Sequence, residues 1–345
     1  MRKNFTKLIV LGTVLFSVHS SAQLDPYYTH YMLNKLAYNP AVAGEKDAIC
    51  VNGLSHQQWL GQKAQDGIYK PGVGQWNDPV NPATNSFSIT APILNNQVGV
   101  GFQVITDKLG YTKDTYFRGS LSYKFRMGRK LPDGSTDQTL AIGADFGMIQ
   151  IQLDGTKYNP LQSGDPKIPS SLVSGGKFDM GAGLYYTHQS LFDGFYAGIS
   201  MTHITAPSVN IPTAFNLTAS RYLYMIAGSR HDFGNLAIMP SIMIKSLGAP
   251  TQVDLGVRAM LNDKIVGGIN IRSRDALSLL LGYYVQPNLY VGYSYDFTAF
   301  SKVNQYTHTG THEIFASYCF DINPKPEKTL RPRYNVRYLE GYTLY

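Results

Sequence analysis

The feature that most constrains this chain is an alternation of apolar and polar residues that recurs along most of its length. One stretch reads VGVGFQV over residues 98–104, and similar stretches cover 253–261, 265–272 and 289–296. A period of two residues indicates a β-strand with two unlike faces. Here one face is apolar, and the other carries mainly Gly, Ser, Asn and single charges. The chain is therefore expected to form a sheet whose two sides meet different surroundings.

Continuing this pattern predicts about fourteen strands. They begin near Ala48, Asn85, Gln97, Lys113, Gln138, Phe178, Phe195, Arg221, Leu236, Gln252, Ile265, Leu277, Leu289 and Thr311. Each strand and its connection then have about 23 residues, which suits membrane-spanning strands of about 10 residues. Neither a linker nor a change of composition divides this region. We therefore expect one barrel domain over residues 48–322.

Composition separates a membrane barrel from a soluble sandwich. Only 15% of the residues are charged, and 43% are hydrophobic. A soluble sandwich buries its apolar face and covers its outer face with polar residues, whereas a membrane barrel turns the apolar face toward lipid. The net charge of +7 lies largely near the two ends, so a nucleic-acid-binding face is not indicated. We predict an all-β, transmembrane antiparallel β-barrel of about 14 strands, embedded in outer-membrane lipid.

The two ends of the chain fall outside this barrel. Residues 1–22 have the charged start, the apolar run 8–18 and the small-residue end of a secretory signal peptide. Residues 23–47 show no sustained alternation, and residues 323–345 form a basic, proline-containing tail. The first of these segments could be a strap along the periplasmic rim, a plug, or a docking surface for a partner.

The lengths of the connections predict which way the barrel faces. If the first strand runs outward, the inner connections are short, at residues 91–96, 190–194, 232–235, 262–264 and 286–288. The outer ones are then the longest, at residues 61–84, 153–177, 206–220 and 298–310, and 127–137 is a longer inner exception. Outer-membrane barrels sort their connections in this way. Both termini should therefore be periplasmic.

Two cysteines fall at opposite ends of the strand region. Cys50 lies near the start of the first strand, and Cys319 lies near the end of the last. Barrel closure makes those strands neighbours, and the alternation points both thiols inward, in an oxidising compartment. They either form a disulfide or remain two free thiols offset by a step in register.

Signatures of catalysis and metal binding are missing from the sequence. It contains no phosphate-binding loop, zinc-hydrolase motif or serine-hydrolase motif. The histidines show no metal-ligand spacing beyond His308 and His312, and we interpret them as solvated residues of loops and strand ends. We therefore expect no enzyme activity, no cofactor and no metal.

Several charged residues occupy polar positions of the strands and should face the lumen. They are Lys245, Asp254, Arg258, Arg272, Asp296 and Glu313. They could line a selective pore or form an internal salt-bridge network. We favour the network, because ionisable groups at membrane depth need partners.

One segment resembles a known family. Residues 25–44, DPYYTHYMLNKLAYNPAVAG, are similar to the N-terminal signature of the PorP/SprF family of the type IX secretion system of Bacteroidota. The likeness continues in QWLG at 58–61 and in the closing strand THEIFASYCF at 311–320.

This resemblance implies a non-enzymatic outer-membrane barrel that binds, helps to export or anchors a secreted substrate. Such a substrate would be an adhesin with a type B C-terminal sorting domain, used in gliding or surface attachment. Some members associate instead with periplasmic ring components of the machine. The motif makes eight residues candidates for partner binding: Asp25, Pro26, Tyr31, Met32, Asn34, Tyr38, Asn39 and Pro40. The alternative function is a diffusion porin for general or hydrophobic solutes.

Overall fold

The computed structural model describes residues 25–321, except 47, 61–80, 132–135, 159–167, 211–215, 247–250, 299 and 301–309. The predicted signal peptide, the basic tail and His308 lie outside the described residues. So does most of the long connection that follows the first strand. Within the described residues, no helix is long and apolar enough to cross a membrane.

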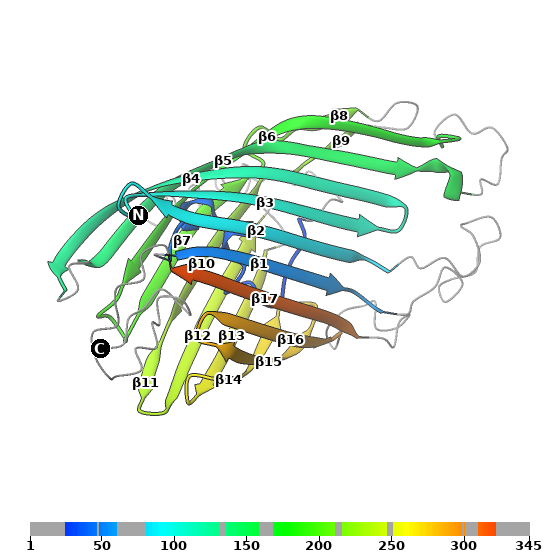
Figure 1. Ribbon diagram of the computed structural model, residues 1–345. Coiled ribbons are helices and arrows are strands. Elements are labelled where there is room, and N and C mark those ends of the chain that lie inside the picture. The colour runs from blue at the N-terminus through cyan, green and yellow to red at the C-terminus, as the bar shows by residue number, and fades with distance from the viewer. Residues whose placement is uncertain are drawn as a thin grey trace, which may run out of the picture.

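The chain forms one large antiparallel sheet that closes on itself (Figure 1). Its strands are β1 (Ala48–Gln57), β2 (Ala83–Ile93), β3 (Val98–Leu109), β4 (Thr112–Lys130), β5 (Thr136–Asp154), β6 (Leu172–His188), β7 (Phe195–Thr202), β10 (Tyr222–Ser229), β11 (His231–Phe233), β12 (Leu236–Ser246), β13 (Gln252–Leu261), β14 (Ile265–Arg272), β15 (Leu277–Gln286), β16 (Leu289–Phe297) and β17 (Thr311–Asp321). A separate two-stranded sheet consists of β8 (Ser208–Asn210) and β9 (Asn216–Thr218).

The pairings confirm the predicted barrel. Strand β1 pairs with β17, and β10 pairs with both β7 and β12, so the described sheet has no open end. The sheet has 15 strands, but β10 and β11 are separated only by Arg230 and occupy one place in the wall. Counting that pair once leaves 14 wall strands, the number that the alternation predicts.

The two faces of the wall differ as the alternation predicts. Large apolar side chains point outward, including Phe102 at 46% exposed and Leu281 at 65% exposed. Polar side chains such as Gln103 and Asn270 point inward and are almost fully buried. A barrel with its apolar side chains outside is stable in lipid and not in water.

The barrel has two unlike ends. At the short-turn end, where β1 begins, the connections include 94–97, 262–264 and 287–288. At the long-connection end, where β1 finishes, they include 155–171 and 203–221. The tight turn at 110–111, between β3 and β4, is a short connection at this second end.

Two predicted boundaries are wrong. Strand β6 begins at Leu172 rather than near Phe178, and β4 continues to Lys130. The pair Gly175–Gly176 removes the side chains that would have shown the alternation, yet the backbone of β6 still pairs with β5 there. The connections predicted at 153–177 and 127–137 are correspondingly shorter.

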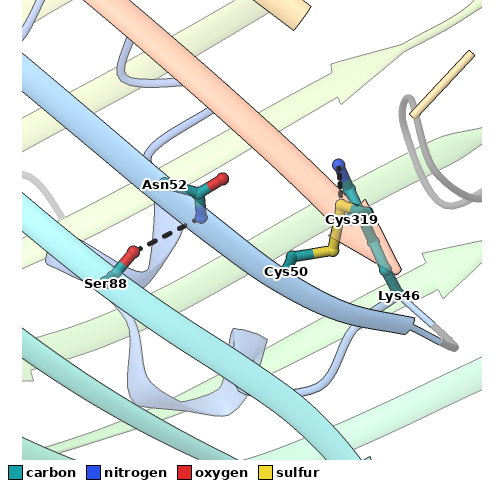
Figure 2. Close-up of a disulfide and its surroundings, with 5 residues drawn as sticks. All are labelled: Lys46, Cys50, Asn52, Ser88 and Cys319. Atoms are coloured by element: carbon teal, nitrogen blue, oxygen red, sulfur yellow. Dashed lines mark hydrogen bonds between the residues drawn. A yellow bond between two sulfur atoms is a disulfide. The ribbon is translucent and has the colours of Figure 1, made fainter. Parts of the chain in front are cut away.

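A disulfide joins the first and last strands (Figure 2). Cys50 and Cys319 are directly opposed in the β1–β17 register, with their Cα atoms 4.1 Å apart. Both side chains are buried. Lys46, just before β1, places its Nζ 4.0 Å from the Cys319 Sγ.

Residues 25–46, here called the lumen segment, lie inside the ring of strands (Figure 1, blue). The segment contains two short 3-10 helices, η1 (Lys35–Ala37) and η2 (Pro40–Val42). Pro40 starts η2, and the Asn39 side chain caps it by accepting a hydrogen bond from the Ala41 N–H. The segment belongs to the same buried core as the inner side chains of the wall.

Candidate functional site

The lumen segment crosses much of the barrel interior. Its first described residue, Asp25, is bound by the wall where β7 and β12 approach the long-connection end. From there the segment leads to Lys46, which precedes β1 at the short-turn end. The contacts between this segment and the wall form the candidate functional site.

Asp25 is held by four wall residues. Its carboxylate accepts hydrogen bonds from the Thr202 hydroxyl at 3.1 Å and the Tyr224 hydroxyl at 3.0 Å. The His203 Nε2 lies 2.7 Å from its Oδ1, and the Lys245 Nζ donates to its backbone carbonyl. Burial alone would raise the pKa of the Asp25 carboxyl, but the His203 imidazole and the Lys245 ammonium hold that pKa below its ordinary value.

A second carboxylate, that of Asp179, connects this cluster of contacts around Asp25 to the wall. The His203 Nδ1 lies 2.6 Å from an Asp179 oxygen, so the imidazole bridges two acids. The Arg118 guanidinium lies 3.9 Å from Asp179 and donates a hydrogen bond to the Ala37 carbonyl of the lumen segment at 3.5 Å. One connected group of charges therefore touches the segment at two places.

Glu313 is the centre of another group. Its two carboxylate oxygens accept hydrogen bonds from the backbone N–H groups of Thr29 at 2.9 Å and His30 at 2.7 Å. The His30 Nδ1 lies 2.7 Å from one oxygen, and the His56 Nδ1 lies 2.8 Å from the other. Glu313 and both histidines are fully buried. A carboxylate with four such contacts is a strong anchor for the start of the segment.

Arg272 joins the same region from β14. It lies 3.5 Å from an Asp254 oxygen and 3.2 Å from an Asp296 oxygen. Asp296 accepts a hydrogen bond from the Thr29 hydroxyl at 2.7 Å. The guanidinium also lies over the Tyr27 ring, 4.1 Å from its centroid. Strands β14, β16 and β17 of the wall thus hold this part of the segment together.

Further along the segment, wall side chains satisfy its backbone carbonyls. The Ser200 hydroxyl donates to the Tyr38 carbonyl at 2.8 Å, and the Ser122 hydroxyl donates to the Ala43 carbonyl at 2.7 Å. Buried carbonyls without such donors would be costly. The segment has only two short 3-10 helices and no strand ladder, so the wall supplies donors to carbonyls such as these two.

The eight motif residues all lie in the lumen segment. Six of them are buried, namely Tyr31, Met32, Asn34, Tyr38, Asn39 and Pro40, and Asp25 and Pro26 are half-buried. Their contacts hold the segment in the barrel; the Tyr31 hydroxyl, for example, lies 2.9 Å from the Ser241 hydroxyl. A partner can reach the buried ones only if the segment leaves the lumen.

The six charged residues predicted to face the lumen all lie on its inner side. Lys245, Asp254, Arg258, Arg272, Asp296 and Glu313 are each at most 3% exposed. Ion pairs join Arg272 to two of these acids. The lumen segment supplies further partners, which no pattern within the strands could reveal.

The interpretation of the histidines as solvated is wrong for three of them. His30, His56 and His203 are at most 1% exposed and face carboxylates. For His56 the sequence does hold a signal, because it shares the inward parity of Cys50 and is opposed to Glu313 in the β1–β17 register. His312 is half-buried, and its Nδ1 lies 2.8 Å from the Tyr293 hydroxyl.

The site brings together charged groups and hydrogen-bonding groups. In the part of the chain that the structure describes, no group of three His, Cys, Asp or Glu side chains is placed to hold a metal ion. A recess at the short-turn end is lined by the lumen segment, including Leu33 and Lys46, and by Cys50. It is the part of the occupied lumen that opens at that end.

Among solved structures the likeness is weak. An outer membrane protein of Acinetobacter baumannii, Omp33, is 11% identical with a TM-score of 0.44, covering 80% of this chain and 100% of that one. The monoaromatic hydrocarbon channel CymD is 12% identical with a TM-score of 0.43, covering 86% and 94%. A FadL homologue of Pseudomonas aeruginosa is 13% identical with a TM-score of 0.46, covering 88% and 96%. These values carry no function across.

A search of curated proteins found no match to this sequence. Comparison with protein-family models gives a stronger result than the solved structures do. The family model described as type IX secretion system membrane protein PorP/SprF matches residues 20–318, which is nearly the whole chain. The matched range contains the first thirteen wall strands and most of β17. A closed barrel of this build belongs in the outer membrane, and the family works with the secretion machinery. The chain is therefore a member of the PorP/SprF family of type IX secretion system membrane proteins.

Proposed function

We propose that this protein is a plugged, non-conducting and non-enzymatic barrel that binds a type IX secreted substrate and helps to export it or anchor it at the cell surface. The observation that supports this most is the lumen segment. Residues 25–46 occupy the interior and are tied to the wall by Glu313, Asp296, His203 and Lys245. A diffusion porin needs a continuous water path through its lumen. The many buried contacts between residues 25–46 and the wall leave little room for such a path.

We propose further that the short-turn end faces the periplasm. Outer-membrane barrels keep short turns on the periplasmic side. The start of β1, the disulfide and the end of β17 then lie on that side, and the tail at 323–345 begins there. The recess beside Leu33 and Lys46 and the basic tail become the surfaces available to periplasmic ring components.

The partner itself is proposed to be a secreted adhesin with a C-terminal sorting domain. It would contact the long connections at the outer end, because exposed loops carry recognition and tolerate change. The shape of the barrel end then depends on the lumen segment, whose motif residues are mostly buried. In this proposal the motif acts chiefly by keeping the barrel filled.

Ion conductance in planar lipid bilayers tests the plug. The wild-type protein is expected to give no stable channel, and a variant lacking residues 25–39 should conduct while still inserting. A point variant of the lipid-facing wall, Leu281→Val, is the matched control and should stay closed. Steady conductance by the wild type, similar to that of the deletion, would overturn the proposal in favour of a diffusion porin.

Surface retention of the adhesin tests the binding role separately. Cells without this protein should lose surface adhesin or release it into the medium, and the wild-type gene should restore it. The deletion of residues 25–39 should fail to restore it although the barrel is in the membrane. Normal retention in cells that lack the protein would contradict the anchoring role, whatever the conductance.

A further inference from the structure

Strand β6 extends well beyond its neighbour β7 at the long-connection end of the barrel. All of β6 pairs with β5, but only residues 182–188 pair with β7. Just past this pairing the Ile204 N–H donates to the Met180 carbonyl at 2.9 Å. Residues 172–179, here called the β6 edge, are about 25 Å long and pair with no strand on the β7 side among the described residues.

The main chain of the β6 edge presents hydrogen-bonding groups on that side. In an antiparallel ladder the N–H and C=O of one residue point the same way, and every second residue faces the same neighbour. Because the Met180 carbonyl points to the β7 side, the main-chain groups of Phe178, Gly176 and Ser174 do so as well. Those groups have no main-chain partner within the described part of the chain. A row of this kind is a template for another strand.

The β8–β9 hairpin lies behind the β6 edge. Gly175 shares the inward parity of the buried Asp179, and a Cβ added to it would come within 2.5 Å of the Asn210 carbonyl oxygen and 2.8 Å of the Val209 side chain. In the described residues β8 pairs with β9 and not with β6. The hairpin therefore covers the inner face of the β6 edge and leaves its main-chain groups to another partner.

Another overhanging edge of the same wall is protected against pairing. At the short-turn end β4 continues past its pairing with β3. That stretch carries the exposed Arg126, Arg129 and Lys130, and its register with β5 is interrupted beside Gly128. Charged side chains and bulges are the means by which proteins keep strand edges from pairing. The β6 edge keeps a continuous register with β5, and Lys177 is its one exposed charged residue.

We propose that the β6 edge is a strand-addition site, and that its occupant is an extended segment of the secreted substrate. This inference rests on the proposed function, in which the long-connection end meets the substrate, and it adds how the substrate is held. The added segment would continue the wall above β7 and run antiparallel to β6, which is the more stable pairing per residue. Main-chain hydrogen bonds would supply affinity, and pockets for alternate side chains would supply selectivity.

The side chains of the β6 edge indicate which segment fits. On the outer face Leu172 is 62% exposed and Phe178 is 56% exposed, so an added strand should place apolar side chains beside them. On the inner face Lys177 is exposed and makes no ion pair with another described residue. An acidic residue on the opposite face of the segment would pair with it. The expected occupant is therefore a strand with one apolar face and an acid on the other.

Photo-crosslinking in cells tests the site in the full-length protein. A photoreactive phenylalanine analogue replaces Ser174, which belongs to the outward set of the β6 edge. Thr115 is the matched control, because it lies in the same row of the wall, points outward, and is paired with a strand on both sides. We expect the adhesin in the crosslinked product from position 174 and not from position 115.

Gly176→Pro tests the main-chain hydrogen bonds. The Gly176 N–H faces away from β5, so a proline there leaves the wall ladder intact, as edge strands allow, but removes a donor from the site. Gly176→Ala is the control, because it keeps the N–H and its Cβ would have only ordinary contacts at 3.5 Å. Surface adhesin and crosslinking at position 174 should fall about tenfold in the proline variant and stay unchanged in the alanine variant.

Heat-modifiable gel migration checks that the proline variant forms a barrel, and crosslinking at position 174 decides if it does not. Unchanged adhesin and crosslinking in a folded Gly176→Pro barrel would overturn strand addition. So would crosslinks at position 174 that contain only this chain or a second copy of it. The anchoring role would survive both results, because it depends on cells that lack the protein. Normal adhesin retention in those cells would refute the proposed function, and the crosslink would still decide the site.

Discussion

Removing the disulfide should lower the stability of the barrel without changing its fold. Cys50 and Cys319 are 269 residues apart in sequence, so their bond closes a loop that contains almost the whole barrel. The loop-entropy relation for that length gives about −19 cal/mol/K, or about 5.6 kcal/mol at 25 °C, as the restriction on the unfolded chain. Measured disulfides reach about 5 kcal/mol and often less, so we expect Cys50→Ser/Cys319→Ser to lose about 2–5 kcal/mol.

The native state should survive this change. Ten residue pairs join β1 to β17, and only one of them carries the disulfide. The other pairs keep the seam closed, so the effect should come from the unfolded state. Urea titration of protein in lipid vesicles, followed by tryptophan fluorescence and by gel migration of the folded form, measures the loss. The wild type in reductant should match the double variant.

Asn52→Ala is the matched control for this experiment. Asn52 lies two residues beyond Cys50 on β1, and its side chain donates to the Ser88 hydroxyl at 3.3 Å (Figure 2). Its loss should cost about 1 kcal/mol or less. A double cysteine variant no less stable than this control would refute the loop-entropy reasoning. Two free thiols in protein purified without reductant would refute the bond itself.

Three further changes probe the anchors, the fit and the lipid face. Glu313→Ala leaves two buried histidines and two amides of the lumen segment without their acceptor, so hydrogen exchange in residues 25–46 should rise and stability should fall by about 3–5 kcal/mol; unchanged exchange would show that Glu313 is not an anchor. Gly143→Val places a side chain against the backbone of the lumen segment, so it should lower the stability measured by urea titration by about 1–3 kcal/mol and should permit conductance. Gly267→Val, at a position with open space around it, should change neither stability nor conductance. Phe102→Arg on the lipid face should cost about 2–4 kcal/mol of folding stability in vesicles if it lies near the midplane; no loss would argue against a lipid contact there.

The number of strands and the inward or outward orientation of their side chains could be predicted because each strand shows the alternation within its own sequence. An inward or outward position is decided by the pleat, so alternation within about 10 residues is enough. The start of β6 was missed because Gly175 and Gly176 have no side chains to alternate. The opposition of Cys50 and Cys319 followed from closure and parity, which are properties of the whole barrel.

The occupied lumen could not be predicted in the same way. Residues 25–46 have no periodicity, because most of the segment is buried within the wall and no regular solvent face runs along it. Its hydrogen bonds go to residues far away in sequence; Thr29 and Glu313, for example, are 284 positions apart. A strap on the rim and a plug would have had the same composition, so the sequence left both open.

The inward glycines show that the wall and the segment are fitted to each other. An eight-stranded barrel is just filled by its own side chains, so a fourteen-stranded one encloses space that water or chain must occupy. In a water-filled pore inward glycines would have nothing to accommodate. Here a Cβ at Gly99 or Gly143 would strike the backbone of the lumen segment, and one at Gly183 or Gly198 would strike the Asn39 side chain. Those positions therefore suit a wall built around residues 25–46, and a partner that worked through the lumen would first have to break this fit. Contacts at the two ends of the barrel need no such disruption, which is why we look for substrate and machinery there.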